Sequence, residues 1–135
     1  MKGKFVFIGS EKFYIRGVAY GPFCPDENGS LYHNSEVVER DFAQIAANGM
    51  NAIRTYTVPP RWLLDIAQRY GLRVMVGLPW EQHIAFLDDR KRAQAIEENV
   101  RAGVRACAGH PSILCYAFGN EIPAPIVRWH GRRRI

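Results

Sequence analysis

The sequence contains no long apolar run. An apolar stretch at residues 5–8 is too short for the hydrophobic core of a secretory signal, and no small-residue cleavage site follows it. Nowhere does the chain approach the roughly 20 consecutive apolar residues that a membrane span requires. The sequence therefore predicts a soluble chain of cytoplasmic type, without a signal peptide and without membrane contact.

Metal and nucleotide motifs are also missing. The three cysteines are odd in number, and no two cysteines or histidines stand at the spacing of zinc ligands. Cys107 and Cys115 lie among apolar neighbours, which favours buried thiols over a disulfide. No Gly-x-Gly-x-x-Gly or Walker-type loop follows a predicted strand, so the sequence lacks a dinucleotide or phosphate fingerprint. We therefore expect neither a metal nor a cofactor.

Acidic residues are fewer than basic ones: 13 Asp and Glu stand against 18 Lys and Arg, and the formal net charge is +5. Much of this excess comes from arginines close to the C-terminus, and the rest of the chain is near neutral. A solvated basic helix surface is therefore favoured over a nucleic-acid site, and no nucleic-acid partner is predicted. The arginines concerned are Arg128, Arg132, Arg133 and Arg134.

What the sequence does contain is a regular alternation of strand and helix patterns. Apolar runs at 5–8 and 13–16 flank a turn-like segment at 9–12, which predicts a β-hairpin. Val38, Phe42 and Ile45 then recur at helical spacing. After the hairpin the alternation predicts strands around 17–21, 51–57, 72–78 and 112–118, and helices around 35–48, 60–70 and 88–107, with a further helix from about 125.

This alternation predicts an α/β fold in which helices cover a parallel sheet. A (β/α)8 barrel needs about 250 residues, so 135 residues supply about half of one. We predict one domain over 1–135: a hairpin lead-in at 1–16, about four β/α units of a TIM-type barrel, and the start of a fourth helix at 125–135. Because such a partial barrel has open strand edges, we also expect a homodimer or larger assembly.

Polar and aromatic residues gather where the predicted strands end. In a barrel the carboxyl ends of the strands form the active face, so these side chains should lie near one another. Aromatic rings, one cation, an amide and carboxylates together are typical of a carbohydrate site. They are Tyr20 after the first strand, Arg54 and Tyr56 at the second, Trp80, Glu81 and His83 after the third, and Asn120 and Glu121 after the fourth.

Arg54 is unusual because it lies within an otherwise apolar and aromatic strand. A buried guanidinium requires a partner, for which a carboxylate is the natural choice. We therefore expect Glu121 or Glu81 to pair with Arg54. The alternative is a purely structural ion pair.

The segments at 13–18, 51–55 and 119–121 resemble successive barrel strands of the clan A glycoside hydrolases, most closely the family 2 and family 5 types. The resemblance implies a retaining mechanism in which Glu121 is the general acid/base. It further implies that Asn120 binds the sugar 2-hydroxyl and that Arg54 orients the carboxylates. The nucleophile of that clan is a second glutamate on the seventh strand, whereas this sequence ends soon after the fourth. Glu81 is one stand-in for it.

The leading functional prediction is thus a glycoside hydrolase-like domain that binds or cleaves a β-linked carbohydrate. Glu121 would protonate the glycosidic oxygen, held un-ionised by a dry pocket and a nearby second carboxylate. Without that carboxylate the chain should be inactive alone. One alternative is a non-catalytic carbohydrate-binding or accessory region of a larger polysaccharide-processing protein, such as a glycosyltransferase fusion. Another is a generic α/β scaffold in which Asn120 and Glu121 merely end a strand.

Overall fold

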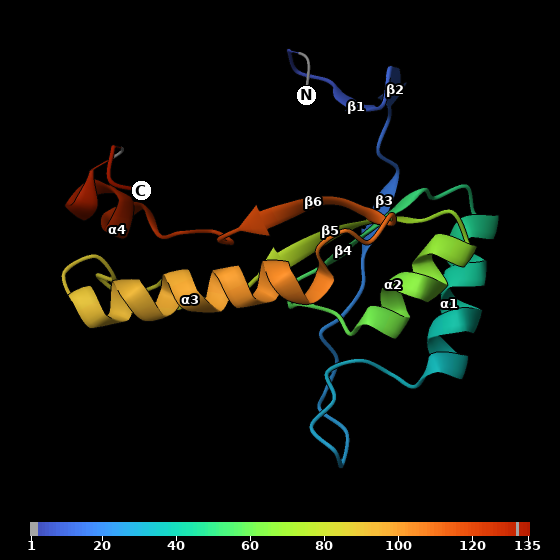
Figure 1. Cartoon of the computed structure of the whole chain (residues 1–135), viewed down its shortest axis with the longest axis horizontal. Coiled ribbons are helices and arrows are strands. Elements are labelled where there is room, and N and C mark those ends of the chain that lie inside the picture. The colour runs from blue at the N-terminus through green and yellow to red at the C-terminus, as the bar shows by residue number, and fades with distance from the viewer. Residues whose placement is uncertain (1–2, 132) are drawn as a thin grey trace.

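The computed structural model describes residues 3–131 and 133–135 and contains a four-stranded parallel sheet (Figure 1). Within this sheet each strand after β3 pairs with the strand before it in the chain, and the order is β3-β4-β5-β6. Sequential parallel order is the arrangement of a (β/α)8 barrel, which confirms the predicted fold class, although these four strands do not close. The strands are β3 Gly17–Ala19, β4 Ala52–Thr55, β5 Arg73–Leu78 and β6 Ile113–Phe118.

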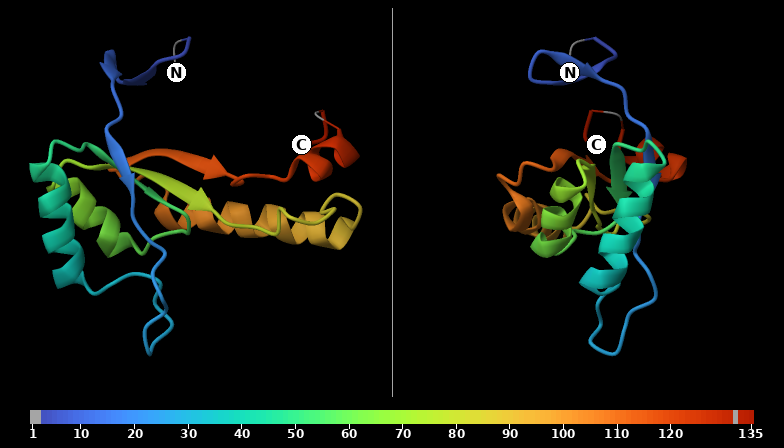
Figure 2. Two further views of the ribbon diagram at one scale, coloured as in Figure 1. Left: turned by 180° about the vertical axis from the view of Figure 1, so that it is seen from behind. Right: turned by 90° about the vertical axis from the view of Figure 1, so that its right-hand side faces the viewer.

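Three helices lie on one side of this sheet, and the N-terminal hairpin stands on the other side (Figures 1 and 2). Two of them begin at side-chain caps. The Asn34 side chain accepts a hydrogen bond from the Val37 amide at 3.0 Å, and the Asp89 side chain accepts from the Lys91 and Arg92 amides. The helices are α1 Ser35–Ala47, α2 Arg61–Arg69 and α3 Arg90–Cys107, and α4 Ala124–His130 follows β6.

The core lies between the sheet and these helices. Alternate strand residues such as Ile53 and Val74 are fully buried against Phe42 and Leu63 of the helices. The intervening residues, among them Arg54, point to the opposite face, which we call the inner face. A hollow of about 480 Å³ lies there, lined by residues that include Ala52, Arg54, Met75 and Leu114. One face of the sheet is thus packed and the other is open.

Both ends of the chain differ in detail from the sequence-based expectation. The hairpin strands are β1 Val6–Ile8 and β2 Glu11–Phe13, and Ile8 pairs with Glu11. The predicted turn over 9–12 is therefore wrong: a two-residue loop suffices because Gly9 adopts a φ of 60°. Helix α4 ends before Gly131, so the predicted helix start at 125–135 is shorter than expected. Residues 1–2 and Arg132 lie outside the described residues.

Within the described part of the chain, no helix is both long and apolar enough to span a membrane. Cys107 is buried, as the sequence predicts, whereas Cys115 is half-buried and Cys24 is exposed. Burial raises the pKa of the Cys107 and Cys115 thiols.

We propose that copies of this chain associate through the edges of the sheet. In the sheet as described, β3 and β6 each pair on one side only. Unpaired edges recruit other strands, and two copies supply the eight strands of a closed barrel. Ile15 and Val18, beside the β3 edge, are 45% and 41% exposed and would be covered. We expect light scattering to give a mass above that of one chain, rising with concentration. A monomeric mass at all concentrations would contradict the proposal.

Candidate active site

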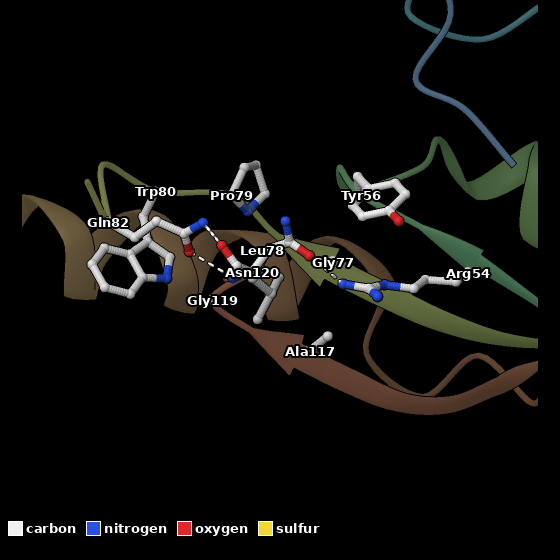
Figure 3. Close-up of a pocket in the computed structure, with 10 residues that line it drawn as sticks. All are labelled: Arg54, Tyr56, Gly77, Leu78, Pro79, Trp80, Gln82, Ala117, Gly119 and Asn120. Atoms are coloured by element: carbon white, nitrogen blue, oxygen red, sulfur yellow. Dashed lines mark hydrogen bonds between the residues drawn. The ribbon is translucent and has the colours of Figure 1, made fainter. Parts of the chain in front are cut away.

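Three strands bring their carboxyl ends together around a small cavity of about 170 Å³ (Figure 3). β4, β5 and β6 are parallel neighbours, so the segments that leave them emerge at the same edge of the sheet. Asn120 and Trp80 therefore lie near each other although they are distant in sequence. The lining residues are Arg54, Tyr56, Gly77, Leu78, Pro79, Trp80, Gln82, Ala117, Gly119 and Asn120.

Arg54 and Asn120 are joined directly across this cavity. The Nη2 atom of Arg54 donates to Oδ1 of Asn120 at 2.7 Å. The guanidinium carbon also lies 4.5 Å from the centre of the Tyr56 ring. A charged donor makes a stronger hydrogen bond than a neutral one, and the ring face attracts the same cation. These two contacts fix both the position and the plane of the guanidinium.

The expectation that a carboxylate pairs with Arg54 is wrong. Its side-chain partner is the neutral amide of Asn120, and no carboxylate lines the cavity within the described residues. Glu81 instead forms an ion pair with Arg92 at 3.7 Å, and Glu121 is exposed. The physical reason is placement: the Asn120 amide reaches Arg54, whereas the Glu121 side chain is exposed outside the cavity. The Nε of Arg54 is buried and has no hydrogen-bond partner among the described residues.

Gln82 holds the main chain of Asn120. Its side-chain amide accepts a hydrogen bond from the Asn120 N–H at 2.6 Å and donates one to the Asn120 carbonyl oxygen (Figure 3). The Gln82 side chain is buried, with 7% of the residue exposed. The sequence analysis did not identify this residue. Its position in the exit segment of β5, between Trp80 and His83, was the only available signal, because its partner is a backbone group.

Glu121 has an unusual backbone conformation. Its φ is 53°, the only positive value at a non-glycine residue in the described ranges. For an L-residue this conformation costs about 1–2 kcal/mol, and a glutamate has no special tolerance for it. Its side chain is exposed and does not line the cavity. The dry pocket expected around Glu121 is therefore absent from this structure, because the open sheet provides no opposite wall.

An aromatic group forms one side of the cavity. The Trp80 ring stacks on Phe118 at 5.1 Å with an angle of 19°, and Phe86 meets Trp80 edge-on at 4.5 Å. These geometries are favourable for aromatic pairs and hold the indole in place. Trp80 thus presents a fixed ring to the cavity, which suits the apolar face of a sugar.

The remaining predicted residues lie elsewhere. Tyr20 is buried in the core, where its hydroxyl donates to Asp41 at 2.9 Å and its ring packs edge-on against Phe42. Burial, then the bond to Asp41, raises the pKa of Tyr20 above its ordinary value. Glu81 and His83 are exposed and do not line the cavity. Of the residues chosen from the sequence, the structure brings together Arg54, Tyr56, Trp80 and Asn120.

Comparison with known proteins places this chain in a family. The family model described as glycosyl hydrolases family 2, TIM barrel domain, matches residues 1–130. A 1,3-beta-glucanosyltransferase, gel1, from Aspergillus fumigatus is 38% identical over 128 residues, which are 90% of this chain and 28% of that protein. Beta-galactosidase 2 from Enterobacter cloacae is 30% identical over 121 residues, which are 84% of this chain and 12% of that protein.

A solved structure shares the fold. The crystal structure of Gas2 in complex with compound 10 superposes with a TM-score of 0.56 and 21% sequence identity, over 78% of this chain and 26% of that chain. This chain therefore spans less than a third of each of these relatives. The match to the family model covers nearly its whole length, and the chain belongs to the TIM barrel domain family of the family 2 glycosyl hydrolases.

Proposed function

We propose that this chain carries the acid/base part of a site that processes β-linked carbohydrate, with Glu121 as the group that protonates the glycosidic oxygen. The observation that carries the proposal is the 2.7 Å bond between Arg54 and Asn120. It fixes the residue directly before Glu121 at the edge of a cavity with an aromatic side. The names of two relatives, a 1,3-beta-glucanosyltransferase and a beta-galactosidase, both refer to β-linked sugars.

Each lining group has a role in such a site. The bond to Arg54 occupies the oxygen of the Asn120 amide and leaves its two N–H donors for a sugar hydroxyl. Trp80 stacks against the C–H face of the ring. Glu121 follows Asn120 in the chain, and the proposal requires its side chain, which is exposed and outside the cavity lining, to turn toward the glycosidic bond of a sugar held by the asparagine.

The chain alone should bind sugar without turning it over. Retaining hydrolysis requires two carboxyl groups about 5–5.5 Å apart. Among the described residues none of those that line the cavity is a carboxylate. The same observation favours a second candidate function, a domain that binds carbohydrate without cleaving it. The two candidate functions differ in whether the Glu121 side chain faces the glycosidic oxygen of the bound sugar.

A matched pair of ligands tests this difference. One is a neutral β-1,3-linked gluco-oligosaccharide; the other is a sugar with a cationic amine in place of the glycosidic oxygen. We expect the amine to bind about tenfold more weakly to Glu121→Gln than to the unmodified chain, because a charge-assisted hydrogen bond of about 1.5–3 kcal/mol is lost. The neutral ligand should bind both alike. Calorimetric titration measures both affinities.

Two outcomes would count against the proposal, and a third would count against the expected inactivity of the chain alone. Failure of both ligands to bind would remove the carbohydrate site. Equal binding of the amine to both proteins would leave only the non-catalytic candidate. Rapid hydrolysis of an aryl β-glycoside, abolished in Glu121→Gln, would show that the chain is catalytically complete, contrary to the expected inactivity.

A further inference from the structure

We propose that Gln82 is the positioning residue of this site: its side-chain amide sets the direction of the Asn120 and Glu121 side chains. The inference rests on the proposed function, because it concerns how the same site is held in order. Gln82 itself does not need to touch the sugar. It acts through the backbone to which it is bonded.

The contact between Gln82 and Asn120 has the form of a β-ladder pair, with a side chain in place of one strand. The Gln82 amide accepts from the N–H and donates to the carbonyl of one residue, which lies 38 positions away in the sequence. Figure 3 shows the glutamine between the Trp80 ring and Asn120, with Arg54 on the far side of Asn120. These two hydrogen bonds hold the segment that follows β5 against the segment that follows β6.

The two hydrogen bonds with Gln82 constrain the backbone that leads into Glu121. The carbonyl of Asn120 belongs to the peptide group that links it to Glu121, and rotation about the next bond defines the φ of 53°. Gly119 also adopts a positive φ, of 80°, and an added Cβ there would lie 3.4 Å from Oε1 of Gln82. The backbone before Glu121 therefore packs directly on the glutamine. Without the hydrogen bonds to Gln82, the backbone before Glu121 would have several lower-energy conformations available.

Two substitutions separate positioning from simple packing. Gln82→Leu keeps the size of the side chain and removes both hydrogen bonds. Gln82→Glu is more informative. Its ionised carboxylate still accepts a hydrogen bond from the Asn120 N–H, but it repels the Asn120 carbonyl oxygen because it has no donor. The protonated carboxyl group restores the missing donor. Gln94→Leu, at an exposed position on α3, is the matched control.

The first measurement needs no ligand. Nuclear magnetic resonance reports rotation of the Arg54 guanidinium about its Nε–Cζ bond, which the bond to Asn120 restricts. We expect rotation to be about fivefold faster in Gln82→Leu, because loss of one hydrogen bond is worth about 1 kcal/mol. The control should match the unmodified chain. Unchanged rotation of Arg54 in a folded Gln82→Leu protein would overturn the inference.

The second measurement is the pH dependence of affinity for the neutral oligosaccharide. In Gln82→Glu the affinity should be about tenfold lower at neutral pH and should recover as the introduced carboxyl group protonates. The unmodified chain and the control should not show that recovery. A Gln82→Glu affinity equal to that of the unmodified chain at every pH would also overturn the inference.

The two measurements keep the two proposals distinguishable. If the unmodified chain binds no oligosaccharide, the proposed function fails, while the rotation of Arg54 still decides whether Gln82 positions Asn120. If Gln82→Leu does not fold, the same guanidinium measurement on Gln82→Glu at low and neutral pH decides the question within one protein.

Discussion

Gly77→Ala is expected to lower the free energy of unfolding by about 3 kcal/mol, at the upper end of the usual cost of overpacking. A Cβ at this position would lie 2.5 Å from the carbonyl oxygen of Thr55 and 2.7 Å from the backbone C and O of Tyr56. These are backbone atoms of the neighbouring strand exit, so no side-chain rotation relieves the contact. β4 and β5 must separate where they reach the cavity. Urea denaturation followed by circular dichroism gives the free energy.

Gly17→Ala is the graded control for this prediction. Its Cβ would lie 3.1 Å from the carbonyl oxygen of Ala52, a contact that a small shift relieves, and β3 is an outer strand. We expect a loss of about 1 kcal/mol or less there. Equal stability of the two variants would show that the exits of β4 and β5 are not held as closely as the structure indicates. Gly77 also lines the cavity, so oligosaccharide affinity should fall together with stability.

Arg54→Lys is expected to weaken oligosaccharide binding at least about tenfold, a change of about 1.4 kcal/mol. An arginine can stack its plane on Tyr56 while an N–H reaches Asn120, and both contacts are present. A lysine has a compact ammonium on a flexible stem and cannot make both contacts in that geometry. Asn120 would then lose the partner that fixes its amide. Calorimetric titration with the neutral oligosaccharide measures the change.

Arg101→Lys provides the comparison, because Arg101 lies on the exposed surface of α3, where its partner among the described residues is Glu97 at 2.8 Å. An exposed pair of this kind contributes little to stability, so both affinity and stability should stay the same. If Arg54→Lys binds the oligosaccharide as tightly as Arg101→Lys does, the Arg54–Asn120 contact is not part of the binding site.

The layout of the fold could be predicted because the patterns that encode it are local. Apolar spacing gave the helices, and Asn34 and Asp89 cap two of them in the structure. The hairpin turn was placed too broadly because a four-residue and a two-residue loop look alike in sequence. Only the backbone angle of Gly9 separates them.

The site could be predicted only in part, for geometric reasons. Arg54 and Asn120 were found because the ends of parallel strands must converge. Tyr20 was misplaced because side chains alternate along a strand: Ala19 pairs with Arg54, so the next residue faces the core. The Gln82 contact could not be predicted, since its partner is a backbone group whose position depends on the whole exit segment of β6.

The order of the sheet also bears on how the chain assembles. Every strand after β3 adds beside the strand that precedes it, so no later segment has to insert between two earlier ones. Pairing between sequence neighbours keeps the loops that must close shorter than any other order of these parallel strands would. A chain emerging from the ribosome could therefore add one β/α unit at a time, from the N-terminus onward. At each stage the newest strand would offer the edge for the next.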